Sequence, residues 1–283
     1  MTACKRLLFL ACVVWFSGPI LGQRTFKTAS VLATGTWYKI SVPADRVYKI
    51  DPAFFATLGI NGSLPSAQIR LFAAGNDMLP ERAGEARIDD LEELAIAVSD
   101  GGDGQLNGND FILFYAEGPH KWSKDSAARR FTHRKNLYAE KAYYFITIGG
   151  NGKRITTQTN PPAAVVSTTT FDERYFHEQD SVNFLSSGKA WWGEELSSLS
   201  GRSLTRGFPL PLSDLAPGLA TLEVDLAARS VGAGSSFAVS LNNSLVAQVP
   251  VRSITPGPYS LFAQQAIQSV GVPLAASTAT VSV

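Results

Sequence analysis

The sequence predicts a mainly β protein made of two β-rich modules, a β-domain with short helices followed by a β-sandwich or jelly-roll module. Short apolar runs rich in Ile, Val, Phe and Tyr recur along the chain, as they do in the strands of sheets. Clusters of Gly, Asn and Pro separate these runs at close spacing, which is typical of sandwiches. The 283 residues are 45% hydrophobic and include 16 Phe, enough to form two buried cores.

The first residues have the layout of a secretory signal peptide, predicted to cover residues 1–22. Lys5 and Arg6 form a positive start, an uncharged apolar run follows at 7–16, and Gly22 offers a small residue before cleavage at Gln23. A membrane anchor is the alternative, but that run is too short to span ~30 Å of hydrocarbon at ~1.5 Å per residue. No later stretch is long and apolar enough to span a membrane, so we predict an exported chain without a transmembrane segment.

Cysteine usage and charge exclude several classes of function. Both cysteines, Cys4 and Cys12, lie inside the predicted signal peptide, so the mature chain has no disulfide, thiol nucleophile or thiolate metal site. The net charge is +1, and removing the charges of Lys5 and Arg6 leaves −1. A balance so close to zero argues against a nucleic-acid partner, whose phosphates require basic patches.

The first module is predicted at residues 23–150. Two short alternating runs around a Pro-Ala-Asp turn at 37–51 predict a β-hairpin. Asp51 as N-cap, Pro52 at the first helical position and Gly59 as a stop then predict a two-turn helix that packs on the hairpin. Further strands are predicted at 69–72, 94–98, 111–115 and 142–148.

The second module is predicted at residues 171–283, after a linker at 151–170 rich in Thr, Asn, Pro and Ala. Its charged and aromatic opening, 171–196, is predicted to begin as a helix. Alternation then predicts strands at 221–227, 236–241 and 244–249, with turns at 232–234 and 242–243. Because the chain stops within a strand-like run at 277–283, we expect an incomplete sandwich, truncated at its C-terminus, in a fragment of a longer reading frame.

The strongest candidate for a ligand site is a Gly-rich loop between two predicted strands. It brings four oxygen-bearing side chains within eleven residues: Asp100, Asp103, Asn107 and Asp110. Calcium takes six to eight oxygen ligands, so these residues are predicted metal ligands, although the twelfth position counted from Asp103 is Phe114 rather than Glu. The alternative interpretation is a solvated turn, in which Asp, Asn and Gly adopt the conformations that turns require. No other cofactor is predicted.

The histidines and acidic residues give no catalytic pattern. The three histidines, His120, His133 and His177, lack a Gly-x-Ser-x-Gly turn or a His pair at helical spacing with Glu, and we interpret them as surface or loop residues. The carboxylates of the pairs Asp89/Asp90 and Glu194/Glu195 are adjacent in sequence, and nothing singles out two of them as a glycosidase pair.

Aromatic side chains allow a second kind of site. Five of them are candidates for a sugar-binding platform: Trp122, Trp191, Trp192, Tyr143 and Tyr144. The alternative is that these side chains anchor cores or interfaces, as aromatic residues more often do.

Five segments in order resemble one family, the PorU sortases of the type IX secretion system, which are gingipain-type cysteine peptidases of Bacteroidetes. The resemblance spans about residues 30–200 and continues more weakly to the end. Its segments are WYKISVPADRVYKID with DPAFFATLGI, IRLFAAGNDMLPE, GNDFILFYAEGPHKW, FTHRKNLYAEKAYYFITIGG and FHEQDSVNFLSSGKAWWGEEL.

The resemblance implies a multidomain cell-surface cysteine peptidase that removes the C-terminal sorting signal of secreted cargo and joins the cargo to anionic lipopolysaccharide. The Cys-His pair of such enzymes lies C-terminal to the matching region, so no residue here is assigned a catalytic role. We therefore expect a non-catalytic N-terminal scaffold in the envelope, between periplasm and outer-membrane surface. Its expected partners are its own downstream peptidase domain, secretion cargo and outer-membrane translocon or attachment proteins. The alternative is a free-standing exported module that binds carbohydrate or protein.

Overall fold

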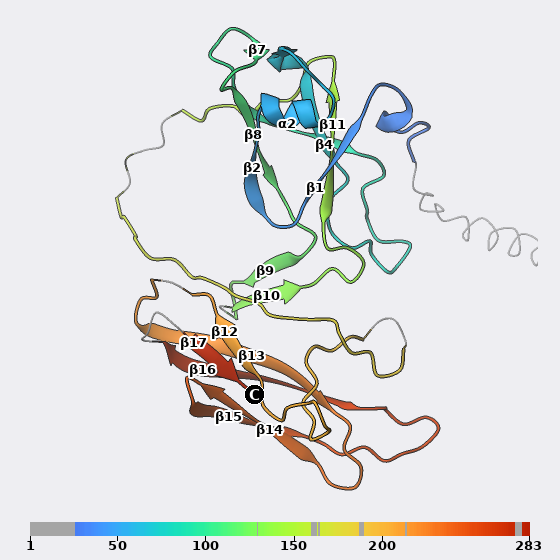
Figure 1. Ribbon diagram of the computed structural model, residues 1–283, viewed down its shortest axis with the longest axis vertical. Helices are drawn as coiled ribbons and strands as arrows, with labels where there is room; N and C mark the ends of the chain where they lie inside the picture. The colour runs from blue at the N-terminus through green and yellow to red at the C-terminus, as the bar shows by residue number, and fades with distance from the viewer. Residues whose placement is uncertain are drawn as a thin grey trace, which may run out of the picture. The chain divides into compact units, whose positions relative to one another are not determined.

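The computed structural model describes residues 26–128, 130–159, 163, 165–186, 190–212, 214–274 and 279–283. The predicted signal peptide, with Cys4 and Cys12, lies outside the described residues. The fold is mainly β, as predicted, and its strands form small antiparallel sheets (Figure 1). The chain divides into two compact units: unit 1 ends at Lys121 and resumes at 135–159, and unit 2 consists of 122–134 and 160–283. No helix in the described ranges is long and apolar enough to cross a membrane.

Unit 1 contains two main sheets and a short strand pair. The first sheet has the order β1(Tyr38–Val42)–β11(Ala142–Ile148)–β4(Ile69–Ala73)–β5(Glu92–Leu94). The second has the order β2(Arg46–Ile50)–β8(Phe111–Ala116)–β6(Ala97–Ser99), and β3(Leu64–Pro65) pairs with β7(Gln105–Leu106). Two 3₁₀ turns, η1(Val31–Ala33) and η2(Ser66–Gln68), complete the unit. Residues from both main sheets share one core, which includes Val42, Ile50, Leu71, Ile112 and Ile146.

The hairpin predicted at 37–51 is wrong, although both of its strands exist. β1 pairs with β11 and β2 pairs with β8, so the chain passes from one sheet to the other around Ala44. The crossing is fixed by Asp45, whose Oδ1 accepts the Gly118 N–H at 2.6 Å, and by Tyr48, whose hydroxyl donates to the Ala44 carbonyl at 3.0 Å. Alternation predicted both strands, but it contains no information on which strand lies beside each of them.

The predicted helix is confirmed as α2(Pro52–Thr57). Asp51 caps it, because its Oδ1 accepts the Phe54 N–H at 2.9 Å, and Pro52 occupies the first turn where no N–H is needed. Gly59 ends the segment with a φ of 80°, a conformation that favours glycine. The helix buries Phe55, which is 1% exposed, in the core of unit 1.

Unit 2 contains the predicted sandwich. One sheet has the order β12(Gly207–Leu210)–β17(Ala279–Ser282)–β14(Ser235–Leu241)–β15(Ser244–Val251), and the other consists of β13(Gly218–Ala228) and β16(Gln264–Leu274). Asn242 and Asn243 form the β14–β15 turn with φ values of 48° and 67°, as expected of a tight hairpin. The buried core consists of Val239, Leu241, Val249, Val272, Ala279 and Val281.

Three further expectations differ from the structure. The strand predicted at 94–98 is divided between β5 and β6, which belong to different sheets. The helix predicted at the start of 171–196 is wrong: the described part of this segment contains no helix, and its regular pairing is limited to isolated bridges, such as the antiparallel bridge between Val182 and Trp192. Two of its aromatic residues pack against other parts of unit 2: Phe176 against Trp122 and His133, and Phe184 against Phe262. The hairpin of β9(Lys121–Asp125) and β10(Arg130–Arg134) was not predicted.

Candidate functional site

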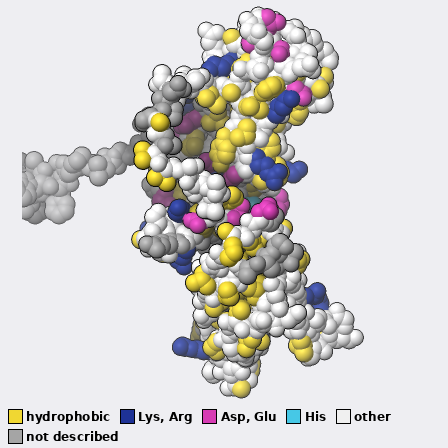
Figure 2. Space-filling model, turned by 90° about the vertical axis from the view of Figure 1, so that its left-hand side faces the viewer, with side chains coloured by type: hydrophobic (Ala, Val, Ile, Leu, Met, Phe, Trp, Pro, Cys, Tyr) yellow, Lys and Arg dark blue, Asp and Glu magenta, His cyan; other side chains and the backbone are white. Residues whose placement is uncertain are grey.

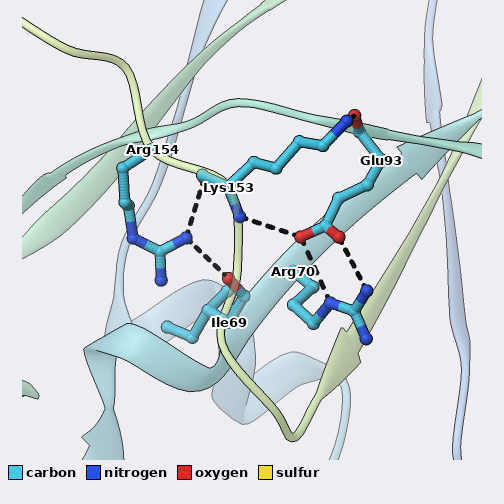
Figure 3. Close-up of polar contacts among 5 residues, drawn as sticks. All are labelled: Ile69, Arg70, Glu93, Lys153 and Arg154. Atoms are coloured by element: carbon cyan, nitrogen blue, oxygen red, sulfur yellow. Dashed lines mark hydrogen bonds and ion pairs between the residues drawn. The ribbon is translucent and has the colours of Figure 1, made fainter.

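A partly buried polar network in unit 1 surrounds Glu93 on β5 (Figure 3). Arg70 of β4 binds this carboxylate with two nitrogens, Nε at 3.2 Å from Oε1 and Nη2 at 2.6 Å from Oε2. The N–H of Lys153 donates to the same Oε1 at 2.9 Å. The Glu93 side chain is 10% exposed and that of Arg70 is 31% exposed, so water screens this pair only partly.

The charges of this network stabilise each other. The hydrogen bond from Arg70, and then that from the Lys153 amide, hold the pKa of Glu93 below its usual value against the effect of burial. The hydrogen bond with Glu93 in turn raises the pKa of Arg70. A bidentate, charge-assisted pair of this kind fixes geometry as well as charge. Because the carboxylate is ionised and three donors bind it, it is suited to positioning the chain rather than to transferring protons.

Arg154 extends the network to the backbone of the neighbouring turn. Its Nη2 donates to the Ser66 carbonyl at 2.6 Å, and its Nη1 donates to the carbonyls of Ile69 at 3.2 Å and Lys153 at 2.9 Å. The chain passes so close that a Cβ on Gly152 would lie 2.5 Å from the Ile69 carbonyl oxygen. The segment after β11 is therefore held firmly on η2 and β4.

The same network contains Asp100, the first of the predicted calcium ligands. Its Oδ2 accepts the Ser66 hydroxyl at 2.5 Å and its Oδ1 accepts the Gly102 N–H at 3.0 Å. These two hydrogen bonds hold the pKa of Asp100 below its usual value. The carboxylate thus links the loop to the turn whose carbonyl Arg154 binds.

The other predicted ligands are also engaged in turns. Asp103 Oδ1 accepts the Gln105 N–H at 2.8 Å, and Asp110 Oδ2 accepts the Asn107 N–H at 2.9 Å. Four glycines of the loop have positive φ values, as tight turns require: Gly101, Gly102, Gly104 and Gly108. Within the described ranges, no three acidic or histidine side chains form a group that could hold a metal ion. The geometry favours the turn interpretation, and the calcium site stays a prediction.

The three histidines lie in separate packing and hydrogen-bonding environments. His120 Nδ1 accepts the N–H of Asn136 at 3.0 Å in unit 1. In unit 2, the His133 ring lies 3.5 Å from that of Phe176 between centroids, and His177 Nε2 lies 2.7 Å from Glu194 Oε1. Each imidazole therefore contributes to local structure, but His133 lies within strand β10 rather than in a loop.

Sequence reasoning missed a cluster of aromatic and cationic side chains in unit 2, here called the hairpin cluster: Trp122, Phe131, His133, Arg174 and Phe176. The Arg174 guanidinium lies 5.3 Å from the Trp122 ring centroid and 4.9 Å from that of Phe131, within cation–π range. Phe131 and His133 alternate along β10, and this period-2 pattern was the signal that could have predicted the strand.

A cavity of about 240 Å³ adjoins the cluster, lined by Lys124, Ser126, Arg130, Phe131 and Asp172. It is smaller than the roughly 300–1,000 Å³ of typical small-molecule sites. Its lining carries both signs of charge. On the face shown in Figure 2, acidic and basic side chains are likewise interspersed, with no large area of one sign.

The structure does not assemble the five predicted platform residues into one surface. Trp122 packs against His133 within the hairpin cluster. Trp192 lies 6.1 Å from Phe184 between ring centroids, and Trp191 is 41% exposed. The other two residues, Tyr143 and Tyr144, belong to unit 1, where their consecutive positions on β11 place them on opposite faces of the sheet. The Tyr143 ring is 43% exposed and lies beneath Lys39 Nζ, whereas the Tyr144 ring is 2% exposed, so Tyr144 fits the interpretation as a packing anchor.

Comparison with known proteins identifies the class to which this fold is related. No family model and no curated protein matches the chain. A comparison with solved structures shows that the β-rich fold of this chain is PorU-like. One matching structure is the crystal structure of dimeric latent PorU from Porphyromonas gingivalis, with a TM-score of 0.70 and 27% sequence identity. It covers 92% of this chain and 24% of that chain, so this chain spans about a quarter of the length of the structure that it matches.

Proposed function

We propose that this chain is the non-catalytic N-terminal scaffold of a cell-surface cysteine peptidase that processes the C-terminal sorting signal of type IX secretion cargo. The observation that carries the proposal is the likeness to PorU over 92% of the chain at 27% identity. Order and spacing of the five resembling segments support the same assignment.

The chemistry of the described residues supports a positioning role. A cysteine peptidase needs a thiolate beside an imidazole. Both cysteines of this chain fall in the predicted signal peptide, and the three histidines take part in local contacts. The Cys-His pair of the proposed enzyme is therefore supplied by polypeptide outside residues 1–283. The partners proposed for the scaffold are that peptidase domain, the cargo and outer-membrane attachment proteins.

The test begins with the genomic locus downstream of Val283. The proposal expects the reading frame to continue into several hundred residues with a His and a Cys in a caspase-like α/β pattern. A chromosomal deletion of residues 26–283 should then leave cargo with its sorting signal attached, as judged by mass spectrometry of the secreted protein. A thiol-directed active-site probe should still label the deleted enzyme, which separates loss of positioning from unfolding of the peptidase domain.

Two results would overturn the proposal. One is normal removal of the sorting signal by the deleted enzyme. The other is a genuine stop codon after Val283, which would favour a free-standing exported envelope module that binds carbohydrate or protein. Peptidase activity in the purified chain of residues 23–283 would contradict the non-catalytic assignment directly.

A further inference from the structure

Strand β13 is an edge strand of the sandwich in unit 2 and, among the described strands, pairs with β16 alone. Four of the described strands lie at the edges of its two sheets: β12, β15, β13 and β16. Three of them contain a proline, which cannot donate to an added strand: Pro209, Pro250 and Pro273. β13 has eleven residues and contains neither proline nor a basic side chain.

The backbone of β13 is paired on one side. Its residues pair with β16 in an unbroken register from Gly218↔Leu274 to Ala228↔Gln264. No other strand of the described residues pairs with it. Because the N–H and C=O groups of a strand point alternately to its two sides, about half of the peptide groups of β13 face the free edge.

The two faces of β13 differ in chemistry. On the outer face, Glu223 accepts the Ser269 hydroxyl at 2.8 Å and lies 3.7 Å from Arg130, with both charged side chains half-exposed. Asp225 binds Gln265 at 2.8 Å, and burial together with the nearby Glu223 charge raises the pKa of Asp225. The outer face therefore has an excess of negative charge.

The inner face is apolar and incompletely covered. Leu222, Val224 and Leu226 pack on the core of the sandwich but remain only partly buried, whereas Val239 and Val249 of the facing sheet are at most 1% exposed. A strand added beside β13 would cover the inner residues further with its apolar side chains. Its alternate side chains would lie next to the two carboxylates.

We propose that the free edge of β13 accepts an extended segment in which apolar residues alternate with Lys or Arg, supplied by the same polypeptide beyond residues 1–283. The apolar positions match the inner face and the basic positions match Glu223 and Asp225. The source rests on the proposed function, since the chain spans 24% of the PorU structure that it matches and the remainder would be tethered at high local concentration. A second copy of β13 paired antiparallel about Val224 is disfavoured, because this register places Glu223 opposite Asp225.

The edge is tested first on the purified chain, independently of the proposed function. The probe is a synthetic nine-residue peptide that alternates Val and Lys, and the control peptide has the same composition with its lysines grouped at one end. We expect the alternating peptide to bind and to slow hydrogen exchange within 218–228, while the grouped peptide does neither. Equal effects of the two peptides, or binding without slower exchange in 218–228, would refute strand addition.

A matched pair of variants tests the charge assignment. The double substitution Glu223→Lys/Asp225→Lys should weaken binding of the alternating peptide about tenfold, because cross-strand attraction becomes repulsion. The control Glu173→Lys/Glu195→Lys changes the net charge equally outside the sandwich strands and should leave the affinity unchanged. Equal loss in both variants would show that only net charge matters, and the proposal would be wrong.

The source is tested on the protein of the complete reading frame. Its β13 amides should exchange slowly without added peptide, and it should no longer bind the alternating peptide. Fast exchange at 218–228 in that protein would refute the intramolecular source. If that protein shows fast exchange at 218–228 but contains a downstream Cys-His pair, the intramolecular source is wrong while the proposed function stands. The two proposals can therefore fail separately.

Discussion

The hydroxyl of Tyr144 allows a quantitative test of the core of unit 1. The ring lies on β11 and is 2% exposed. The hydroxyl accepts the Glu117 N–H at 2.6 Å and the Asn76 Nδ2 at 2.8 Å, and it donates to the Glu117 carbonyl at 3.0 Å. The substitution Tyr144→Phe keeps the ring but removes all three interactions.

The expected cost follows from the groups left without a partner. The Glu117 N–H loses its acceptor at a partly buried position, whereas the Asn76 amide can turn towards water. Leaving a buried donor unpaired costs about 1–3 kcal/mol and losing an ordinary hydrogen bond about 1 kcal/mol, so Tyr144→Phe should lower the free energy of unfolding by about 2–3 kcal/mol. A loss of 2 kcal/mol makes protected amides exchange about thirtyfold faster.

Native-state hydrogen exchange of the β11 amides is the appropriate assay, because it reports on unit 1 even if unit 2 unfolds separately. The neighbouring Tyr143→Phe is the matched control: that ring is 43% exposed and lies beneath Lys39 Nζ at 3.8 Å, a contact that Phe preserves. The control should change stability by less than about 0.5 kcal/mol. If the two variants accelerate exchange equally, the hydroxyl contributes nothing and the reasoning is refuted.

The remaining predictions concern pH, close packing and metal. Burial raises the pKa of Tyr144 to about 12. Because the pKa of the folded state exceeds the ordinary value of 10.0, the stability that this phenol contributes is complete below pH ~10 and is lost as the pH rises towards 12. In alkaline unfolding, the stability of the parent should therefore fall more steeply over this pH range than that of Tyr144→Phe. The pKa of Glu93 is lowered, so its contribution is present above its ordinary value of 4.5 and lost on acidification; Glu93→Gln should flatten the acid limb of the pH–stability curve. Gly152→Ala should destabilise unit 1 by about 1–3 kcal/mol in urea titrations through overpacking, whereas Gly84→Ala, with open space around its Cβ position, should be neutral. The carboxylates of Asp100, Asp103 and Asp110 accept hydrogen bonds from within the loop and from η2. Calcium should therefore leave the thermal midpoint of unfolding the same as in chelator, whereas a rise of several degrees would establish the calcium site.

Local signals in the sequence predicted those features that depend on local physics. The α2 helix was predicted from its cap, its first-turn proline and its terminal glycine, and each acts as expected. The range of β11 was predicted to the residue, because six of its seven side chains are apolar or aromatic and several are β-branched or aromatic, as strands favour. The Asn242–Asn243 turn was also predicted from a local signal, because few residues other than Asn and Gly tolerate its positive φ values.

Pairing between distant strands could not be predicted in the same way. β1 and β2 have the alternation and the turn of a hairpin, yet each bonds to a strand far along the chain. Val42 and Ile50 are buried in one core that both sheets share, so their apolar character does not distinguish a hairpin from two strands in different sheets. The Glu93 network was also missed, since it joins residues up to 88 positions apart whose types are common on any surface.

The two corners of unit 1 show why such polar groups are needed. At two of the points where the chain changes sheets, it passes from one main sheet to the other within a few residues: between β1 and β2, and between β5 and β6. At the first corner Asp45 binds the Gly118 amide, and at the second Ile96 is fully buried while its amide donates to the Lys153 carbonyl at 3.2 Å and its carbonyl accepts the Ile155 N–H at 3.0 Å. A corner interrupts the ladder and leaves backbone groups that must find partners elsewhere. The Glu93 network secures 153–155 beside the second corner, so its charged residues are explained by the fold before any binding function is invoked.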